Sequence, residues 1–135
     1  MKMVGKMAGR KVVLYARCNY KDESALDKQM NTLREYAEKY NYDIVAEYSD
    51  YGCDFPAKRP GMQEVMQAAA EGVFETLIVI NLDRLSRKQN EMAPLVKFFT
   101  EAGVKVQCVD GYESGPYITT ELYEKLQEVL LAKRK

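Results

Sequence analysis

Short apolar runs and amphipathic stretches alternate along most of the chain. Residues 12–16 form an apolar, partly β-branched run, and shorter runs occupy 44–48 and 104–108. Residues 77–80 are the most apolar run, and continuous apolarity favours a strand covered on both faces, as in a parallel sheet. The pattern predicts four strands, with 77–80 at the centre of the sheet.

Apolar residues repeat at helical spacing in the segments between these strands. The first such segment covers residues 26–40, and Ser24 followed by Asp27 is a weak capping signal at its start. The second lies between Pro60, which suits a first helical position, and Gly72, which suits a helix terminus. The spacing predicts one helix in each segment.

Two more helices are predicted in the last third of the chain. Gly103 closes the first of them, and Pro94 is expected in its first turn, because deeper in a helix a proline removes a hydrogen bond and clashes with the preceding turn. Apolar residues within 122–130 form the face of the second, whose basic end complements the helix dipole. The alternation predicts a three-layer α/β domain with a mostly parallel sheet of four or more strands, plus a C-terminal helix.

The residue types narrow the possible chemistry. A chain of 135 residues fits one domain with one principal site. Histidine is absent, which excludes serine–histidine triads, cysteine–histidine pairs, histidine bases and histidine-bearing zinc sites. Because 20 Lys and Arg residues balance 20 Asp and Glu residues, any anion site must be a local feature.

Cysteine usage and hydropathy indicate a reducing, aqueous compartment. Cys18, Cys53 and Cys108 show no CxxC spacing, so neither a disulfide framework nor a thiolate metal site is predicted. No apolar run approaches the roughly 18 residues of a membrane span, and the N-terminus lacks a signal-peptide core. No glycine-rich nucleotide loop occurs. We expect a cytoplasmic protein with no membrane contact, metal or cofactor.

Four arginines follow predicted strands, at the edge where open α/β sheets bind ligands. Arg17 follows the first strand, Arg59 the second, and Arg84 and Arg87 the third. The planar guanidinium matches phosphate and carboxylate oxygens, so the four predict an oxyanion or phosphate pocket, with Asp83 placed to orient one of them. The alternative is four separate solvated side chains in weak surface ion pairs.

Four segments near the predicted strand ends form a recognisable set: Tyr15-Ala16-Arg17, Asp50-Tyr51-Gly52, Lys58-Arg59-Pro60-Gly61 and Leu82-Asp83-Arg84-Leu85-Ser86-Arg87. Together they resemble the catalytic domain of the resolvase/invertase family of serine recombinases. The resemblance runs from about Lys11 to Asp110, and the last segment is highly specific when it follows an apolar strand. It implies DNA recombination, in which a serine attacks a DNA phosphodiester, arginines bind the phosphate, and dimers assemble into tetramers that exchange strands.

Transferred position by position, the resemblance assigns roles to particular residues of this chain. Phosphate binding falls to Arg17, Arg59, Arg84 and Arg87, with Tyr15 and Asp83 in support.

The serine of the family has no counterpart here. The family pattern Tyr-Ala-Arg-Val-Ser reads Tyr15-Ala16-Arg17-Cys18-Asn19, so a carboxamide takes the nucleophile's position. Cys18 would point to the opposite face of the strand and pack as a small buried hydrophobe. Ser86 is not at the nucleophile's position, and Ser24 is assigned to a helix cap. We therefore expect that the chain binds phosphate but does not cleave DNA.

The expected organisation is a flexible segment at 1–10, a resolvase-like domain at 11–118 and a dimerisation-type helix at 119–135. Family members continue through a longer helix into a DNA-binding domain, so site recognition is expected to be missing here. The expected partners are DNA, a second copy in a homodimer or higher oligomer, and an active recombinase.

Two alternatives use other chemistry at the same edge. The first is an active recombinase fragment in which another residue replaces the serine. The second is a Mg²⁺-dependent phosphotransfer site built from Asp50, Asp54 and Asp83, since Mg²⁺ prefers carboxylate and water ligands.

Overall fold

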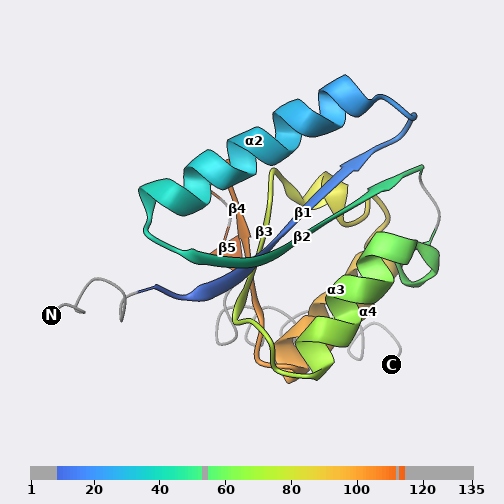
Figure 1. The fold of residues 1–135 in the computed structure, drawn as a ribbon. Coiled ribbons are helices and arrows are strands. Elements are labelled where there is room, and N and C mark those ends of the chain that lie inside the picture. Colours follow the sequence, from blue (N-terminus) through green and yellow to red (C-terminus); the bar gives the residue numbers. More distant parts are fainter. Residues whose placement is uncertain (1–8, 53–54, 112, 115–135) are drawn as a thin grey trace, which may run out of the picture.

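The structure, a computed structural model, describes residues 9–52, 55–111 and 113–114 (Figure 1). The predicted helix at 119–135 and most of the predicted N-terminal segment lie outside these residues. Within the described part of the chain, no helix is both long enough and apolar enough to cross a lipid bilayer.

A five-stranded sheet in the order β2-β1-β3-β4-β5 forms the middle of the domain. The first four strands are mutually parallel and β5 pairs antiparallel with β4. The prediction of a mostly parallel sheet with the third strand at its centre is confirmed. The strands are β1 Lys11–Cys18, β2 Asp43–Tyr51, β3 Thr76–Val79, β4 Lys105–Cys108 and β5 Glu113–Ser114.

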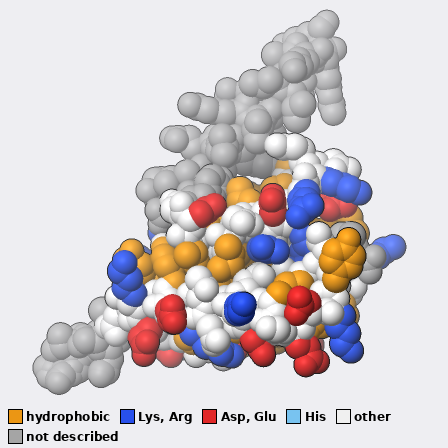
Figure 2. All heavy atoms as spheres, turned by 90° about the horizontal axis from the view of Figure 1, so that it is seen from above, with side chains coloured by type: hydrophobic (Ala, Val, Ile, Leu, Met, Phe, Trp, Pro, Cys, Tyr) orange, Lys and Arg blue, Asp and Glu red, His pale blue; other side chains and the backbone are white. Residues whose placement is uncertain are grey.

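Helices cover both faces of this sheet, as the three-layer prediction requires. Figure 1 shows α2 on one face and α3 and α4 together on the other. The helices are α2 Glu23–Lys39, α3 Pro60–Ala70 and α4 Gln89–Glu101, with 3-10 turns η1 Pro56–Lys58 and η2 Leu82–Arg84. Figure 2 looks onto the face that carries α2, where basic and acidic side chains are interspersed.

Strand β1 is buried on both sides and sends alternate side chains to the two faces. Leu14 packs in the cluster under α2, whereas Val13 and Tyr15 pack in the larger cluster under α3 and α4. The same alternation sends Arg17 to the α3 side of the sheet, at the end of the strand. Burial of β1 therefore fixes which way the first predicted site residue faces.

The start of α2 differs from the prediction. The N-cap is Asp22, whose Oδ1 accepts a 3.1 Å hydrogen bond from the backbone N–H of Ala25. Ser24 is the second residue of the helix, so the capping role assigned to it was wrong. Asp and Ser cap helices about equally well, and the more N-terminal residue had the geometry for it.

The position of Pro94 was also predicted wrongly. Helix α4 begins at Gln89, so Pro94 is its sixth residue and lies in the second turn. The earlier start is held by Ser86, whose Oγ donates to a Glu91 carboxylate oxygen at 2.7 Å and accepts from the Lys88 N–H at 3.1 Å. These side-chain bonds stabilise the first turn and outweigh the cost of a proline in the second.

Candidate functional site

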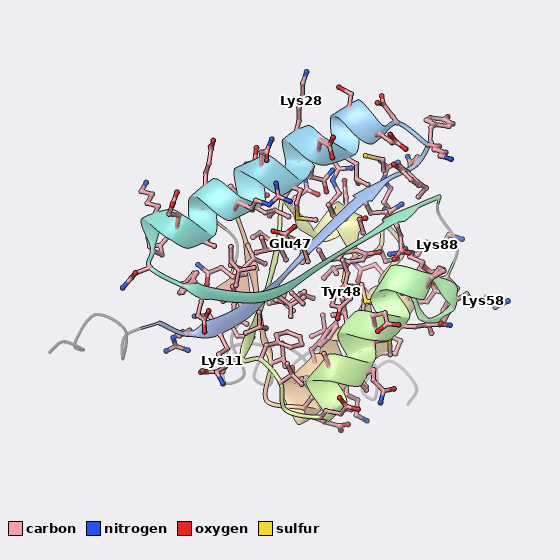
Figure 3. All side chains as sticks on the ribbon, viewed as in Figure 1. Lys11, Lys28, Glu47, Tyr48, Lys58 and Lys88 are labelled. Atoms are coloured by element: carbon pink, nitrogen blue, oxygen red, sulfur yellow. The ribbon has the colours of Figure 1, made fainter. Side chains whose placement is uncertain are left out.

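The carboxyl ends of the parallel strands bring the predicted site segments to one edge of the sheet. Arg17 and Asp50 are paired in register on β1 and β2, and η2 follows β3 beside them. Figure 3 shows Lys58 and Lys88 at this same end of the molecule, whereas Lys11 lies at the other. Basic side chains therefore gather at this edge, where Asp50 and Asp83 also lie.

Arg17 is the hub of the edge and only 3% of its surface is exposed. Its guanidinium donates to four oxygens: the backbone carbonyls of Arg84 at 2.9 Å, Asp83 at 2.5 Å and Gly52 at 2.7 Å, and Oδ1 of Asn19 at 2.9 Å. One side chain thus ties the end of β1 to η2 and to the loop after β2. Four of its five guanidinium N–H groups therefore bind other parts of the protein and hold the site together.

Arg59 and Arg84 lie against this hub. Arg59, 3% exposed, donates from Nη1 to the carbonyl of Arg84 at 3.3 Å, and Arg84 donates from Nη1 to the carbonyl of Arg17 at 3.0 Å. Among the described residues, the buried Nε–H of Arg84 has no hydrogen-bond partner. A buried donor without an acceptor costs roughly 1–3 kcal/mol.

The charges of the arginines act on one another. Burial lowers the pKa of Arg17, and the nearby positive charges of Arg59, Arg84 and Arg87 lower it further, against an opposing effect of Tyr15. Arg87 is therefore within electrostatic reach of the hub, although its own side chain is exposed. Like charges gathered in this way favour a bound anion.

Asp50 organises the other side of the edge and is 6% exposed. Its Oδ2 accepts from the Tyr15 hydroxyl at 2.7 Å and from the Met62 N–H at 2.9 Å, and its Oδ1 accepts from the Gly61 N–H at 2.7 Å. A carboxylate from β2 thus caps the first turn of α3. Burial raises the pKa of Tyr15, and so does its hydrogen bond to Asp50.

Gly61 is required by this close approach of β2 to α3. A Cβ at that position would lie 2.8 Å from the Asp50 Oδ2 and would overlap the backbone carbonyl of Ser49. The Arg59-Pro60-Gly61 sequence therefore places the arginine at the edge, the proline at the first helical position, and the glycine against the carboxylate.

The two remaining predicted site residues are more exposed. The Asp83 side chain faces solvent, and its backbone carbonyl, not its carboxylate, accepts from Arg17. Asn19 follows the end of β1 and is exposed, with its amide oxygen held by Arg17.

Sequence reasoning missed the role of Gln29. From α2, its Oε1 accepts from the Arg17 N–H at 3.0 Å and its Nε2 donates to the Arg17 carbonyl at 3.3 Å. Its signal in the sequence is a polar side chain next to Met30, on the helix face that packs against the sheet. Gln29 fixes the backbone from which both the hub arginine and Asn19 extend.

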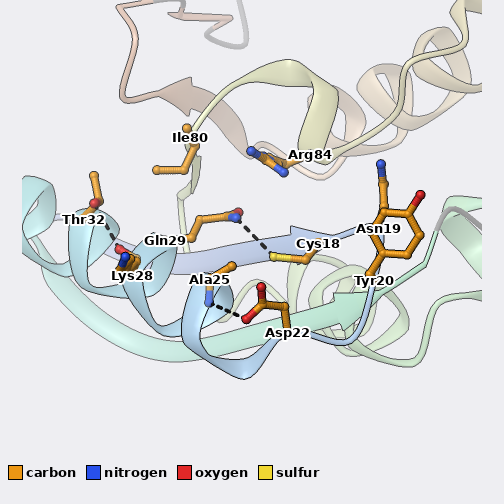
Figure 4. A pocket seen from close by; sticks show the side chains of 10 residues that line it. All are labelled: Cys18, Asn19, Tyr20, Asp22, Ala25, Lys28, Gln29, Thr32, Ile80 and Arg84. Atoms are coloured by element: carbon orange, nitrogen blue, oxygen red, sulfur yellow. Dashed lines mark hydrogen bonds between the residues drawn. The ribbon is translucent and has the colours of Figure 1, made fainter.

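Cys18 departs from its predicted environment. Its side chain is half-buried and its Sγ accepts a weak 3.8 Å contact from Gln29 Nε2. It lines a cavity of about 520 Å³ together with Asn19, Tyr20, Lys28 and Arg84. Figure 4 shows Arg84 facing Gln29 and Cys18 across this space. The strand ends at Cys18, so strict alternation of faces no longer applies beyond it.

The predicted magnesium ligands do not converge within the described residues. Asp50 is engaged by three donors and Asp83 faces solvent, while Asp54 lies outside the described residues. Among residues 9–52 and 55–111, no three Cys, Asp or Glu side chains are grouped to hold a metal ion.

Comparisons with known proteins agree with this architecture. The profile of the resolvase N-terminal domain family matches residues 12–133. No curated protein sequence matches the chain significantly.

Solved structures with a similar fold include the N-terminal catalytic domain of TP901-1 integrase, at 24% identity and a TM-score of 0.78, covering 93% of this chain and 97% of the other. A resolvase family site-specific recombinase from Streptococcus pneumoniae is 22% identical with a TM-score of 0.69, covering 93% of each chain. The C-terminal catalytic domain of ISC1926 TnpA, an IS607-like serine recombinase, is 24% identical with a TM-score of 0.68, covering 90% of this chain and 81% of the other.

Proposed function

Because the chain belongs to the resolvase N-terminal domain family, we propose that it is a serine-recombinase-like domain that binds the DNA backbone through its arginine cluster but does not cleave it. Structures with this fold include a site-specific recombinase and an IS607-like serine recombinase, which supports DNA as the partner. The proposed phosphate ligands are Arg17, Arg59, Arg84 and Arg87.

One observation supports phosphate binding above all others. The Arg84 side chain is half-buried among arginines whose charges already lower the pKa of Arg17, and its Nε–H has no acceptor among the described residues. A phosphodiester oxygen that accepts from the Arg84 guanidinium would reduce the mutual repulsion of the cluster. In this arrangement Arg84, Arg59 and Arg87 supply most of the contacts to the phosphate, while Arg17, four of whose five guanidinium N–H groups hold the site together, contributes the fifth.

The proposed loss of cleavage rests on Asn19. A serine hydroxyl there would attack phosphorus, lose its proton and form a phosphoserine diester, while a deoxyribose oxygen leaves as a hydroxyl. The nitrogen lone pair of a carboxamide is delocalised into its carbonyl, and the Asn19 Oδ1 is held by Arg17. Asn19 therefore serves as a hydrogen-bond partner of the hub.

Self-association is the second part of the proposal. The domain pairs with a second copy of itself or with an active recombinase, through apolar residues of the segment 119–135. Sedimentation velocity at increasing concentration tests this directly. A chain that stays monomeric at high micromolar concentration contradicts self-pairing.

The decisive experiment compares the chain with its Asn19→Ser variant on a short fluorescein-labelled duplex across a salt series. Anisotropy reports binding, and denaturing electrophoresis of each sample reports covalent adducts. We expect salt-dependent binding by both proteins and adducts from the serine variant alone. Adducts formed by the unmodified chain overturn the proposed loss of cleavage and favour the active-fragment alternative.

Two further variants locate the phosphate site. Arg84→Gln should weaken binding and lower the salt slope by roughly one unit, as expected for one lost phosphate contact. Arg34→Gln is the matched control, because Arg34 pairs with Glu47 on α2 and β2. Equal effects of the two variants would show that binding is a nonspecific response to net charge.

A further inference from the structure

A cavity of about 520 Å³ opens beside the arginine cluster, between the N-terminal turns of α2 and the turn η2. Arg84 belongs to both the cavity and the arginine cluster, and Asn19, which also lines the cavity, accepts a hydrogen bond from Arg17 of that cluster. This volume is typical of sites that bind small organic molecules. It is larger than a phosphate alone needs. The arginine cluster therefore leaves most of this space unexplained.

The walls of the cavity combine an aromatic ring, amides and apolar groups with the charged residues Asp22, Lys28 and Arg84. Tyr20 at its mouth is 82% exposed, the highest exposure among the large hydrophobic side chains of the described residues. Ala25 and Ile80 supply apolar surface, and the Asn19 side chain adds an amide group (Figure 4). An aromatic face with a nearby amide suits a nucleobase, which stacks on the one and hydrogen-bonds to the other.

We propose that this cavity receives the nucleoside attached to the phosphate bound by the arginines, with Tyr20 stacking on the base. The inference rests on the proposed phosphate site. A nucleotide whose phosphate oxygen accepts from the Arg84 guanidinium has its sugar and base tethered next to that side chain, which lines the cavity.

This occupant has a consequence for the form of DNA that is bound. A base inside a duplex is stacked and paired, and it must leave the stack to enter a protein cavity. A single-stranded or unpaired nucleotide avoids that cost. The domain should therefore bind single-stranded DNA more tightly than duplex of the same sequence. Stacking on Tyr20 accepts any base, so little sequence preference is expected.

The test compares inorganic phosphate with thymidine 5′-monophosphate and thymidine 3′-monophosphate as ligands of the full chain, by calorimetric titration. At least one nucleotide should bind about tenfold more tightly than phosphate, as a stacked base contributes on this scale. Tyr20→Ala should abolish the advantage and Tyr20→Phe should keep it. Tyr40→Ala, which removes another exposed tyrosine beyond the last residue of α2, is the matched control.

Cys18 supplies an independent readout, because its thiol lines the cavity. In a Cys53→Ser background, alkylation by N-ethylmaleimide, followed by intact mass, reports on Cys18, since Cys108 is fully buried. The nucleotide that binds should slow this reaction, and inorganic phosphate at saturation should not.

The outcomes separate the two proposals. Equal affinity for phosphate and both nucleotides, with Cys18 still reactive, overturns the nucleoside cavity and leaves the phosphate site standing. Loss of the nucleotide advantage in Tyr40→Ala as well as in Tyr20→Ala also overturns it. Absence of binding by all three ligands, in a folded protein, removes the phosphate site and the cavity assignment together.

Discussion

The Tyr15 hydroxyl donates a 2.7 Å hydrogen bond to the carboxylate of Asp50, which also accepts the N–H groups of Gly61 and Met62. Tyr15 is fully buried and Asp50 nearly so. Two adjacent strands and the start of α3 therefore meet at one carboxylate. The position of Arg59, immediately before α3, depends on that junction.

Removing the carboxylate should cost more stability than removing the hydroxyl. Tyr15→Phe leaves the carboxylate its two backbone donors and should lower the free energy of unfolding by about 1 kcal/mol. Asp50→Ala leaves a buried hydroxyl and the first N–H groups of α3 without their acceptor, at about 3 kcal/mol. Urea denaturation measures both. Tyr20→Phe, at an exposed tyrosine, should change stability by less than about 0.5 kcal/mol. Equal losses in all three variants would contradict the junction.

Gly61→Ala should destabilise the domain by about 2–3 kcal/mol, because the new methyl group overlaps the Ser49 carbonyl and crowds Asp50. Urea denaturation again provides the measurement. Glu64→Ala, at an exposed position of the same helix, is the control and should be close to neutral. A neutral Gly61→Ala would mean that β2 and α3 are not held in close contact.

Pro94→Ala should stabilise the protein by about 1–2 kcal/mol, because it gives the second turn of α4 the N–H that proline lacks, and the side chain is exposed. The gain is limited because proline also restricts the unfolded chain. Pro60→Ala is the matched control: as the first residue of α3 it has no helical acceptor for its N–H. A stabilisation by Pro60→Ala of the same size would point to an effect on the unfolded state.

Alkaline pH should destabilise the fold through Cys108. Burial, together with the charge of Asp110, raises the pKa of its thiol from 9.0 to about 12. Between these values the unfolded chain loses a proton that the folded chain keeps, so stability falls as pH rises, by up to about 1.4 kcal/mol per pH unit. Urea midpoints across this range measure the slope, and Cys108→Ala should flatten it. An unchanged slope in the variant would assign the effect to other groups, Tyr15 among them.

Most of the fold could be predicted from local patterns. The apolar run that contains β3 is buried on both sides, and such a run already indicates a central strand. Strand order could not be predicted, since it depends on which strands pair at long range. The two-residue strand β5 is too short to leave a periodic signal. The start of α4 was misplaced because the bonds of Ser86 outweigh a general rule about proline.

The residues of the candidate site could be predicted from the sequence, but the hydrogen bonds between them could not. Four arginines after parallel strands indicate a shared edge because the topology brings strand ends together. The acceptors of Arg17 are mostly backbone carbonyls, and every residue carries one, so no sequence pattern marks the carbonyls that it binds. The contact of Gln29 with the Arg17 backbone is hidden for the same reason.

The hub arginine also sets the order in which the site can appear during synthesis. Arg17 leaves the ribosome well before its carbonyl acceptors at Gly52, Asp83 and Arg84, the last of which lies 67 residues later in the chain. A nascent chain that ends before Asp83 has the first arginine but lacks two of the three backbone carbonyls that direct it. The positively charged edge therefore forms late in translation, together with the central strand, and a truncated product would not carry it.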